Sequence, residues 1–152
     1  DAAIRAQLPT AKVVPYVNYE KFLNELCKCD VALAAFPFGN TNSTVDTCLL
    51  GLPTVAHFGP ESPAQSDWMV LQTAGLPSWL ACDNDEDSFQ TALKLVNDPL
   101  ARVKAMAGMD RESLRRKLMS NPGADDQGTF GHVLYSLYRN HGKLINSPTK
   151  VF

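Results

Sequence analysis

The segment from Gly39 to Asp46 carries the side chains of this chain that are best suited to chemistry. It reads GNTNSTVD, a run of small hydroxyl and amide residues with one carboxylate, and it lies between two apolar runs. Gly39 lets the backbone turn sharply or approach a ligand closely. The side chains of residues 41–43 lie beside the unpaired N–H groups of a predicted helix, and such helix N-termini favour phosphate groups.

Asp46 lies one turn into this predicted helix, where its carboxylate can accept hydrogen bonds from the hydroxyls of a sugar. A second interpretation fits the same spacing, because Ser43-x-x-Asp46 is a capping-box pattern. In that case Ser43 and Asp46 cap the helix, and Asn40, Thr41 and Asn42 are ordinary turn residues. The spacing alone leaves both interpretations open, because GNTNS is neither a GxGxxG nor a Walker loop.

The elements around this segment predict an α/β fold with a Rossmann-like parallel sheet flanked by helices. Expected strands span residues 12–17, 31–38, 53–58 and 80–82, and expected helices span residues 19–29, 43–50, 63–75, 86–97, 99–119 and 130–138. The unbroken apolar run VALAAFPF suits a strand that is covered on both faces. Strands that alternate with helices are typical of right-handed crossovers on a parallel sheet, whose ligands bind at the carboxyl ends of the strands.

Helical spacing also predicts which side chains face the core. In the helix over 63–75 the expected inward residues are Trp68, Leu71 and Ala74, and in the helix over 86–97 they are Phe89, Leu93 and Val96. The aromatic residues Trp68, Trp79 and Phe89 are assigned to the core. Gly51 and Pro53 are expected to end the helix over 43–50.

The composition is that of a globular domain. The chain has 152 residues and a net charge of -2, and this charge argues against an electrostatic grip on nucleic acid. No apolar run approaches the ~18 residues of a membrane span, and no secretory signal opens the chain, so we expect a cytoplasmic protein. The chain begins with Asp1 instead of Met, which suggests a piece of a longer protein. The four cysteines lack zinc-site spacing and are expected to be buried free thiols: Cys27, Cys29, Cys48 and Cys82.

The runs FPFGNTNSTVDTCLLGLPTVAHFG and GPESPAQSDWMVLQTAGLPSWLACDNDEDSFQTALKL resemble the C-terminal half of the nucleotide-binding domain in a GT-B glycosyltransferase family. That family contains O-linked N-acetylglucosamine transferase and bacterial cytoplasmic N-glucosyltransferases that modify adhesins. FPFGNTN and GLP-x-WL-x-A are closest to the bacterial branch. The resemblance covers about residues 10–142 and implies one Rossmann-like UDP-sugar-binding domain over residues 1–145, with a polar tail over 146–152.

The resemblance implies a role for eight positions. In the family, a short polar run before the helix binds the diphosphate of a UDP-sugar and a helix carboxylate holds the uridine ribose. The loop after the strand matching KVVPYV contacts the uracil. The implied site residues are Gly39, Asn40, Thr41, Asn42, Ser43, Asp46, Pro15 and Tyr16. The bacterial branch tends to carry His at the position of Tyr16, and His57 faces the cleft by analogy.

The resemblance further implies an inverting transfer of a hexose or N-acetylhexosamine from a UDP-sugar to a protein side chain, without a metal or another cofactor. The family's donor-side lysine and acceptor-side histidine have no counterpart in this chain, so no catalytic residue is assigned. The expected partners are the UDP-sugar, an acceptor protein or peptide, and an N-terminal domain of the same enzyme. Two alternatives stay open, namely a module that binds a nucleotide without catalysis and a protein-interaction domain.

Overall fold

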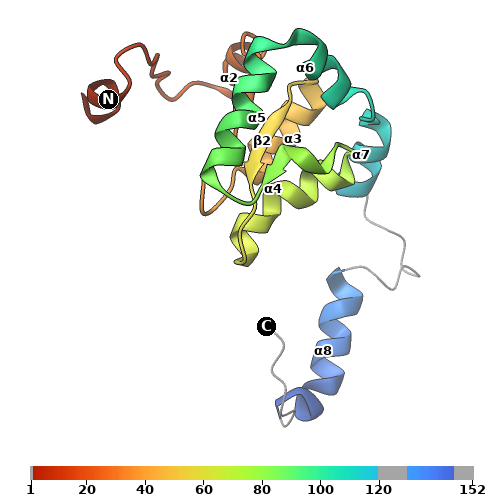
Figure 1. The fold of residues 1–152 in the computed structure, drawn as a ribbon. Helices are drawn as coiled ribbons and strands as arrows, with labels where there is room; N and C mark the ends of the chain where they lie inside the picture. Colours follow the sequence, from red (N-terminus) through yellow and green to blue (C-terminus); the bar gives the residue numbers. More distant parts are fainter. Residues whose placement is uncertain (1, 120–129, 146–152) are drawn as a thin grey trace. The chain divides into compact units, whose positions relative to one another are not determined.

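The computed structural model describes residues 2–119 and 130–145 (Figure 1). The chain divides into two compact units, residues 1–114 and 115–152. The helices are α1 (Ala2–Gln7), α2 (Tyr19–Leu26), α3 (Thr41–Leu50), α4 (Ser62–Thr73), α5 (Asp85–Asn97), α6 (Pro99–Met106), α7 (Arg111–Met119) and α8 (Phe130–Ile145). The strands are β1 (Ala32–Leu33), β2 (Thr54–His57) and β3 (Ala81–Cys82), and a 3-10 turn, η1 (Ser78–Leu80), precedes β3.

The three strands form a parallel sheet in the order β1-β2-β3, which confirms the predicted α/β class. Ala32 pairs with Thr54, and His57 pairs with Cys82. Helix α3 connects β1 to β2 and α4 connects β2 to β3, as expected for βαβ crossovers. The segment that sequence analysis singled out therefore follows the carboxyl end of the edge strand β1.

Strand β2 is the centre of the core. Thr54, Val55 and Ala56 are all buried although successive strand residues point to opposite faces, so both faces of β2 are covered. Helices α3 and α4 contact each other and β2, while α5 contacts β2 and β3 (Figure 1). The buried apolar cluster consists of Cys48, Val55, Ala56, Val70, Leu71, Ala74, Leu76, Leu80, Cys82, Leu95, Ala101, Ala105 and Leu114.

Two predicted strands differ from the structure. Residues 12–17 form no strand, because Pro15 lacks a donor and fits poorly inside a ladder, and the segment is irregular up to the N-cap of α2. The strand expected over 31–38 is reduced to Ala32–Leu33, since only the N–H groups of Ala32 and Ala34 bond to carbonyls of the β2 segment. The remainder of that apolar run forms a turn that includes a cis Phe36–Pro37 peptide.

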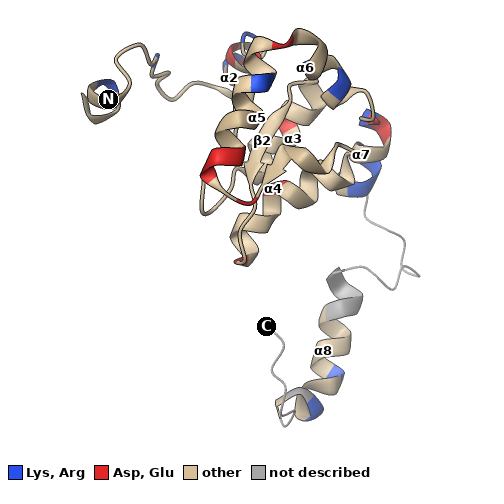
Figure 2. Cartoon of the chain, in the orientation of Figure 1, with Lys and Arg blue, Asp and Glu red and all other residues tan. Residues whose placement is uncertain are grey.

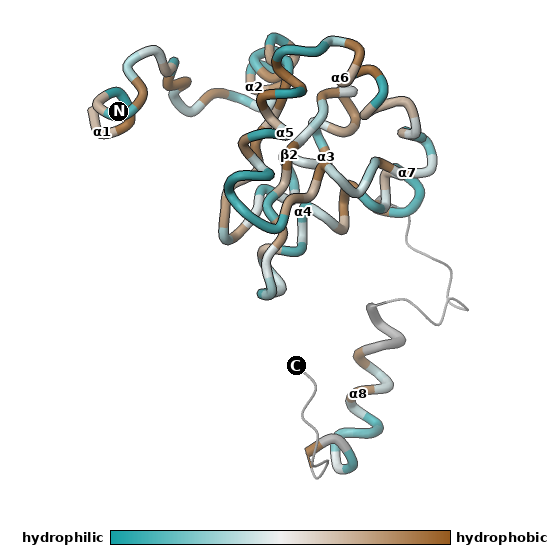
Figure 3. Tube along the Cα trace, viewed as in Figure 1, coloured by the Kyte–Doolittle hydropathy of each residue, from teal (hydrophilic) through white to brown (hydrophobic). Residues whose placement is uncertain are grey.

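The predicted inward face of α5 is wrong, although the helix itself is confirmed. Phe89, Leu93 and Val96 are 60%, 42% and 56% exposed, whereas Leu95 is fully buried. Figure 3 shows hydrophobic and hydrophilic residues interspersed along this helix. Helical spacing in the sequence offers two candidate apolar faces, one with Phe89, Leu93 and Val96 and one with Ala92 and Leu95. Tertiary packing selected the face of Leu95 and the partly buried Ala92.

The helix expected over 99–119 is two helices, α6 and α7, which are separated by a turn at residues 107–110. Gly108 lies in this turn, where a Cβ atom would stand 2.9 Å from the carbonyl oxygen of Gly75. Only a glycine permits so close a backbone approach, so Gly108 lets the turn between the two helices lie against Gly75. Asp110 begins α7 by accepting hydrogen bonds from the N–H groups of Glu112 and Ser113 at 3.0 Å.

Other burial predictions are partly confirmed. Leu71 and Ala74 are buried, and Trp68 is partly buried against Phe58 with the two rings edge to face at 6.5 Å. Trp79 is 38% exposed and the amino group of Lys94 lies 5.1 Å from its ring centroid, so its assignment to the core is wrong.

All four cysteines are free, as predicted, but only two are buried. Cys27 and Cys29 are exposed at the end of α2, while Cys48 and Cys82 are buried. The difference arises because residues 27–29 continue past α2 into a turn on the surface.

Helix α8 belongs to the second unit, and in its described side chains it carries exposed Leu134, Leu137 and Tyr138. The predicted tail over 146–152 and the predicted helix break at Asn121-Pro122-Gly123 lie outside the described residues. In the described ranges, none of the helices has both the length and the apolar character of a membrane span.

Candidate functional site

The loop that joins β1 to α3 is closed by Gly39 and Asn40. Gly39 has a φ of 70°, a left-handed conformation that favours glycine, and its N–H donates to the carbonyl of Ala35 at 2.9 Å. The side-chain amide of Asn40, oriented with its oxygen toward Ala35 N and its nitrogen toward the Gly39 carbonyl, bridges them at 3.2 and 3.1 Å. The loop is therefore tight, and it fixes where the next helix begins.

Helix α3 begins at Thr41, two residues before the predicted start, with Asn40 as the N-cap residue. The Asn40 side chain makes no capping hydrogen bond. Geometry leaves the first N–H groups of a helix without intrahelical partners, so those of residues 41–43 remain available. The capping box predicted for Ser43 and Asp46 is wrong, because both residues lie inside the helix and Asp46 bonds elsewhere.

Asp46 is held by a residue that sequence analysis did not single out. The hydroxyl of Tyr19, the first residue of α2, donates to Asp46 Oδ1 at 2.6 Å. This hydrogen bond and the nearby carboxylate charge favour the neutral phenol, so the pKa of Tyr19 is raised. No local pattern links positions 19 and 46, since the contact joins two helices that are far apart in the sequence.

The segment containing Pro15 and Tyr16 lines a hollow that leads toward this pair. A cavity of about 440 Å³ is lined by Val14, Pro15, Tyr16, Val17, Tyr19 and Phe22. Tyr16 is fully exposed, and the rings of Tyr19 and Phe22 are stacked at 6.4 Å. Aromatic walls of this kind suit the flat face of a nucleobase.

A second hollow adjoins the start of α3. This cavity, of about 250 Å³, is lined from α2, β1 and α3, and its wall includes Phe22, Asn40 and Ser43. Phe22 therefore lines both cavities. Six of the eight predicted site residues lie in the loop or first turns of α3, and the other two lie in the segment before α2. The hydrogen bond from Tyr19 to Asp46 joins these two groups.

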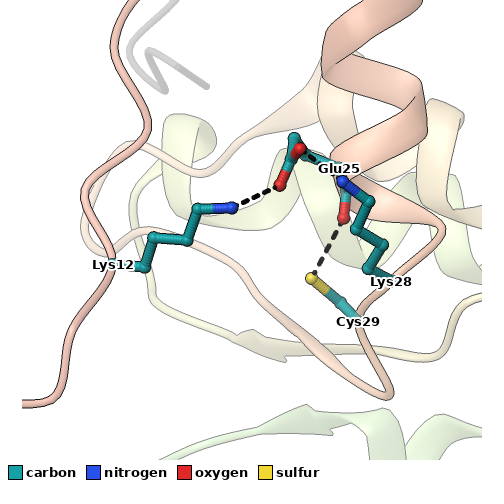
Figure 4. Close-up of polar contacts among 4 residues, drawn as sticks. All are labelled: Lys12, Glu25, Lys28 and Cys29. Atoms are coloured by element: carbon teal, nitrogen blue, oxygen red, sulfur yellow. Dashed lines mark hydrogen bonds and ion pairs between the residues drawn. The ribbon is translucent and has the colours of Figure 1, made fainter.

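An ion pair links the segment that carries Pro15 and Tyr16 to helix α2 (Figure 4). Lys12 Nζ pairs with Glu25 Oε2 at 2.9 Å, and Lys28 pairs with Oε1 of the same carboxylate. The bond from Lys28 and then that from Lys12 lower the pKa of Glu25 to about 2. Both lysines are thus engaged with Glu25, and they do not stand at the start of α3.

A buried carboxylate on α4 forms hydrogen bonds with the end of the loop and with the first turn of α3. Asp67 is 2% exposed, and it accepts hydrogen bonds from Asn40 N and Thr44 Oγ1, both at 2.7 Å. Sequence analysis assigned Asp67 no role, because it lies within an unremarkable helix that is distant in sequence from the loop. Asp67 lies four residues before Leu71 and seven before Ala74, on the face predicted to be inward, which was a signal in the sequence, but only the fold identifies its partners.

His57, which was predicted to face the cleft, lies at the end of β2 and stacks on Phe36 of the loop, with ring centroids 4.2 Å apart. Its Nδ1 lies 3.4 Å from Asp85 Oδ1 at the start of α5. Figure 2 shows the acidic residues of that first turn together. Among the described residues, no three of His, Cys, Asp or Glu are grouped so that they could hold a metal ion.

The geometry therefore offers three adjacent features. An aromatic hollow lies beside a carboxylate that is bonded to a tyrosine hydroxyl, and that carboxylate lies one turn from an uncapped helix N-terminus. Flat apolar walls, a hydrogen-bond acceptor and free N–H groups suit a base, a sugar and a phosphate in that order.

Known proteins share this sequence pattern, although no protein-family model matches the chain. UDP-glucose:protein N-beta-glucosyltransferase of Actinobacillus pleuropneumoniae is 31% identical over 114 residues, which are 75% of this chain and 17% of that protein. A probable UDP-N-acetylglucosamine–peptide N-acetylglucosaminyltransferase SPINDLY of Solanum lycopersicum is 29% identical over 111 residues, which are 73% of this chain and 11% of that protein. The chain thus spans less than a fifth of the length of these relatives.

The fold is shared as well. A mutant of the Thermobaculum terrenum O-GlcNAc transferase superposes with a TM-score of 0.60 at 26% identity, over 85% of this chain and 24% of that chain. This match confirms the predicted fold class, an α/β part of a GT-B glycosyltransferase. In sequence and in fold, this chain is a relative of the glycosyltransferase family that contains O-GlcNAc transferases and bacterial protein N-glucosyltransferases.

Proposed function

We propose that this chain is the donor-binding part of an inverting, metal-independent glycosyltransferase that moves a hexose or N-acetylhexosamine from a UDP-sugar to a protein side chain. The known relatives of this chain, which include a UDP-glucose:protein glucosyltransferase, support the donor class and the protein acceptor. The observation that carries the proposal is the hydrogen bond from Tyr19 to Asp46, because it joins the aromatic hollow to the start of α3.

Each part of UDP has a matching group in this arrangement. The uracil lies in the hollow lined by Pro15, Tyr16 and Phe22, and the ribose hydroxyls donate to Asp46. The diphosphate lies at the N-terminus of α3, where it accepts from the N–H groups and polar side chains of residues 41–43. Gly39 and Asn40 shape the loop that places these groups.

The proposed chemistry follows from these contacts. When the bond between the sugar and UDP breaks, negative charge grows on the diphosphate, and the dipole and N–H groups of α3 stabilise it. An acceptor hydroxyl or side-chain amide attacks the anomeric carbon from the opposite side, which inverts its configuration. The acceptor side of the cleft belongs to another domain of a cytoplasmic enzyme, so the chain alone is inactive in transfer.

Calorimetric titration with UDP tests the proposal. Wild type is expected to bind UDP, and Asp46→Ala and Asn42→Ala each weaken binding by roughly tenfold to a hundredfold, because each removes a hydrogen bond to a charged or polar group. Glu86→Ala, which removes an exposed carboxylate of α5, is the control and leaves the affinity unchanged. Absence of UDP binding by a folded wild-type chain would instead favour an interaction domain.

A further inference from the structure

Asp67 is a buried carboxylate between α4 and α3. The packing of these two helices would not by itself require a charged side chain there. Asp67 lies in the middle of α4 and is 2% exposed. Burying a carboxylate is costly unless strong hydrogen bonds compensate for its lost hydration. The charge of Asp67 also acts on the core. The pKa of the Cys48 thiol is raised to about 11, mainly by burial of the thiol and secondly by the negative charge of Asp67. An apolar or neutral residue would avoid both effects.

The compensating bonds are made to the loop of the candidate site. Asp67 Oδ2 accepts from the backbone N–H of Asn40 and Oδ1 accepts from the hydroxyl of Thr44, both at 2.7 Å. These donors come from the N-cap residue of α3 and from the end of its first turn. One carboxylate thus fixes the start of the helix at two points, with a separate oxygen accepting from each donor.

Gly39 fits the same arrangement. A Cβ atom at position 39 would lie 2.5 Å from Asp67 Oδ2 and 2.8 Å from Ser66 Oγ. The backbone of the loop therefore rests directly on the carboxylate, and the absence of a side chain at Gly39 permits the contact. Because Asn40 does not cap α3 with its own side chain, Asp67 is the side chain that restrains this end of the helix.

We propose that Asp67 is a positioning residue for the diphosphate of the nucleotide donor. It turns the N–H of Asn40 inward, so that the next three N–H groups and the side chains of Thr41 and Asn42 face the ligand. This role rests on the proposed function of the site. The carboxylate also places a negative charge near the bound phosphates, so its two effects on affinity have opposite signs, and this role requires that positioning outweighs repulsion.

Asp67→Ala weighs the two effects against each other, because it removes the charge together with both acceptor oxygens. Positioning predicts that the Kd for UDP rises about tenfold. The Kd for uridine, which lacks phosphates, changes less than about twofold because the uracil and ribose contacts are untouched. Calorimetry with both ligands measures this split, which a general loss of stability would not produce.

Thr44 supplies a matched pair of variants that leaves the charge in place. Thr44→Val removes the hydroxyl bonded to Asp67 and is expected to weaken UDP binding in the same selective way, whereas Thr44→Ser keeps the hydroxyl and retains wild-type affinity. This pair decides the question if Asp67→Ala does not fold. The role of Asp67 is wrong if Asp67→Ala binds UDP as tightly as wild type or more tightly, or if the binding of UDP and of uridine weakens equally.

The wild-type control distinguishes this inference from the function on which it rests. A folded wild-type chain that binds neither UDP nor uridine would overturn the proposed function, and the role of Asp67 with it. Wild-type binding of UDP with no selective loss in Asp67→Ala and Thr44→Val would overturn the role of Asp67 alone.

Discussion

At the scale of single residues, the contact between Tyr19 and Asp46 changes how the site is understood. The spacing of Ser43 and Asp46 suggested that the carboxylate caps its own helix, and the structure gives it a tyrosine hydroxyl from α2 instead. An acceptor that already holds one hydrogen bond and is fixed in direction is well prepared for a second donor, such as a ribose hydroxyl.

The titration of Tyr19 tests this contact. Its pKa is raised because Asp46 accepts a hydrogen bond from the neutral phenol and repels the phenolate. We expect Asp46→Asn to return the Tyr19 pKa toward its ordinary value of about 10, as followed by NMR of labelled tyrosine. The contribution of the bond to stability is fully present below that ordinary value and is lost as pH rises through the raised pKa.

Glu20→Gln, which neutralises a neighbouring carboxylate on α2, serves as the control for this titration and should leave the Tyr19 curve unchanged. Identical Tyr19 curves in Asp46→Asn and wild type would contradict the hydrogen bond.

Cysteine reactivity provides a second test at this scale. The thiolate is the reactive form, and burial followed by the charge of Asp67 raises the pKa of Cys48 to about 11. We expect a thiol reagent such as DTNB to modify the exposed Cys27 and Cys29 in the native protein and to reach Cys48 and Cys82 only after unfolding. Rapid modification of Cys27→Ser/Cys29→Ser protein would contradict the burial of the other two thiols.

At the scale of elements, α5 shows where periodicity was insufficient. Its sequence offers two apolar stripes, and the longer side chains of Phe89, Leu93 and Val96 suggested the wrong one. Spacing identifies residues that share a face, but the choice between faces depends on which of them the sheet can cover.

Adjacent residues of α5 test this assignment with a matched pair. Leu95→Ala removes a fully buried side chain and is expected to lower the free energy of unfolding by about 2–5 kcal/mol. Val96→Ala shortens a side chain that is 56% exposed, and it is expected to change the free energy of unfolding by less than about 1 kcal/mol. Urea denaturation measures both, and a larger loss for Val96→Ala would reverse the assignment.

At the scale of the whole molecule, the core lies within the first of the two units. Every residue of the buried apolar cluster comes before residue 115, and Leu114 in α7 is the last of them. The unit that contains the sheet therefore has its own complete core in the described part of the chain.

Truncation tests this organisation. A chain that ends at residue 119 keeps all of α7 and is expected to melt within about 3 °C of the full chain. A chain that ends at residue 110 loses the fully buried Leu114, which removes about 2–5 kcal/mol and lowers the melting temperature by several degrees. Calorimetry compares the three chains, and equal melting of the two truncated chains would show that Leu114 does not contribute to the core.

The sequence by itself determined the fold class and most helices, and it pointed to the segment of the candidate site. Alternating apolar runs and amphipathic stretches are local properties, so α2, α4 and α5 were predicted to within a few residues. Gly51, predicted to end α3, adopts the left-handed conformation of a helix C-terminus, and its N–H donates to Cys48 O at 3.0 Å. The polar run at residues 39–46 follows a strand, which places it at the carboxyl edge of the sheet.

Only the tertiary structure decided which side chains meet. Residues 12–17 and most of 31–38 form no strand, because a strand needs hydrogen-bonding partners that local propensity does not reveal. Tyr19 reaches Asp46 across 27 positions, and Asp67 reaches Asn40 across 27 positions. Such contacts depend on how the chain closes upon itself and leave no periodic pattern, so the residues that hold the candidate site in place were found in the fold and not in the sequence.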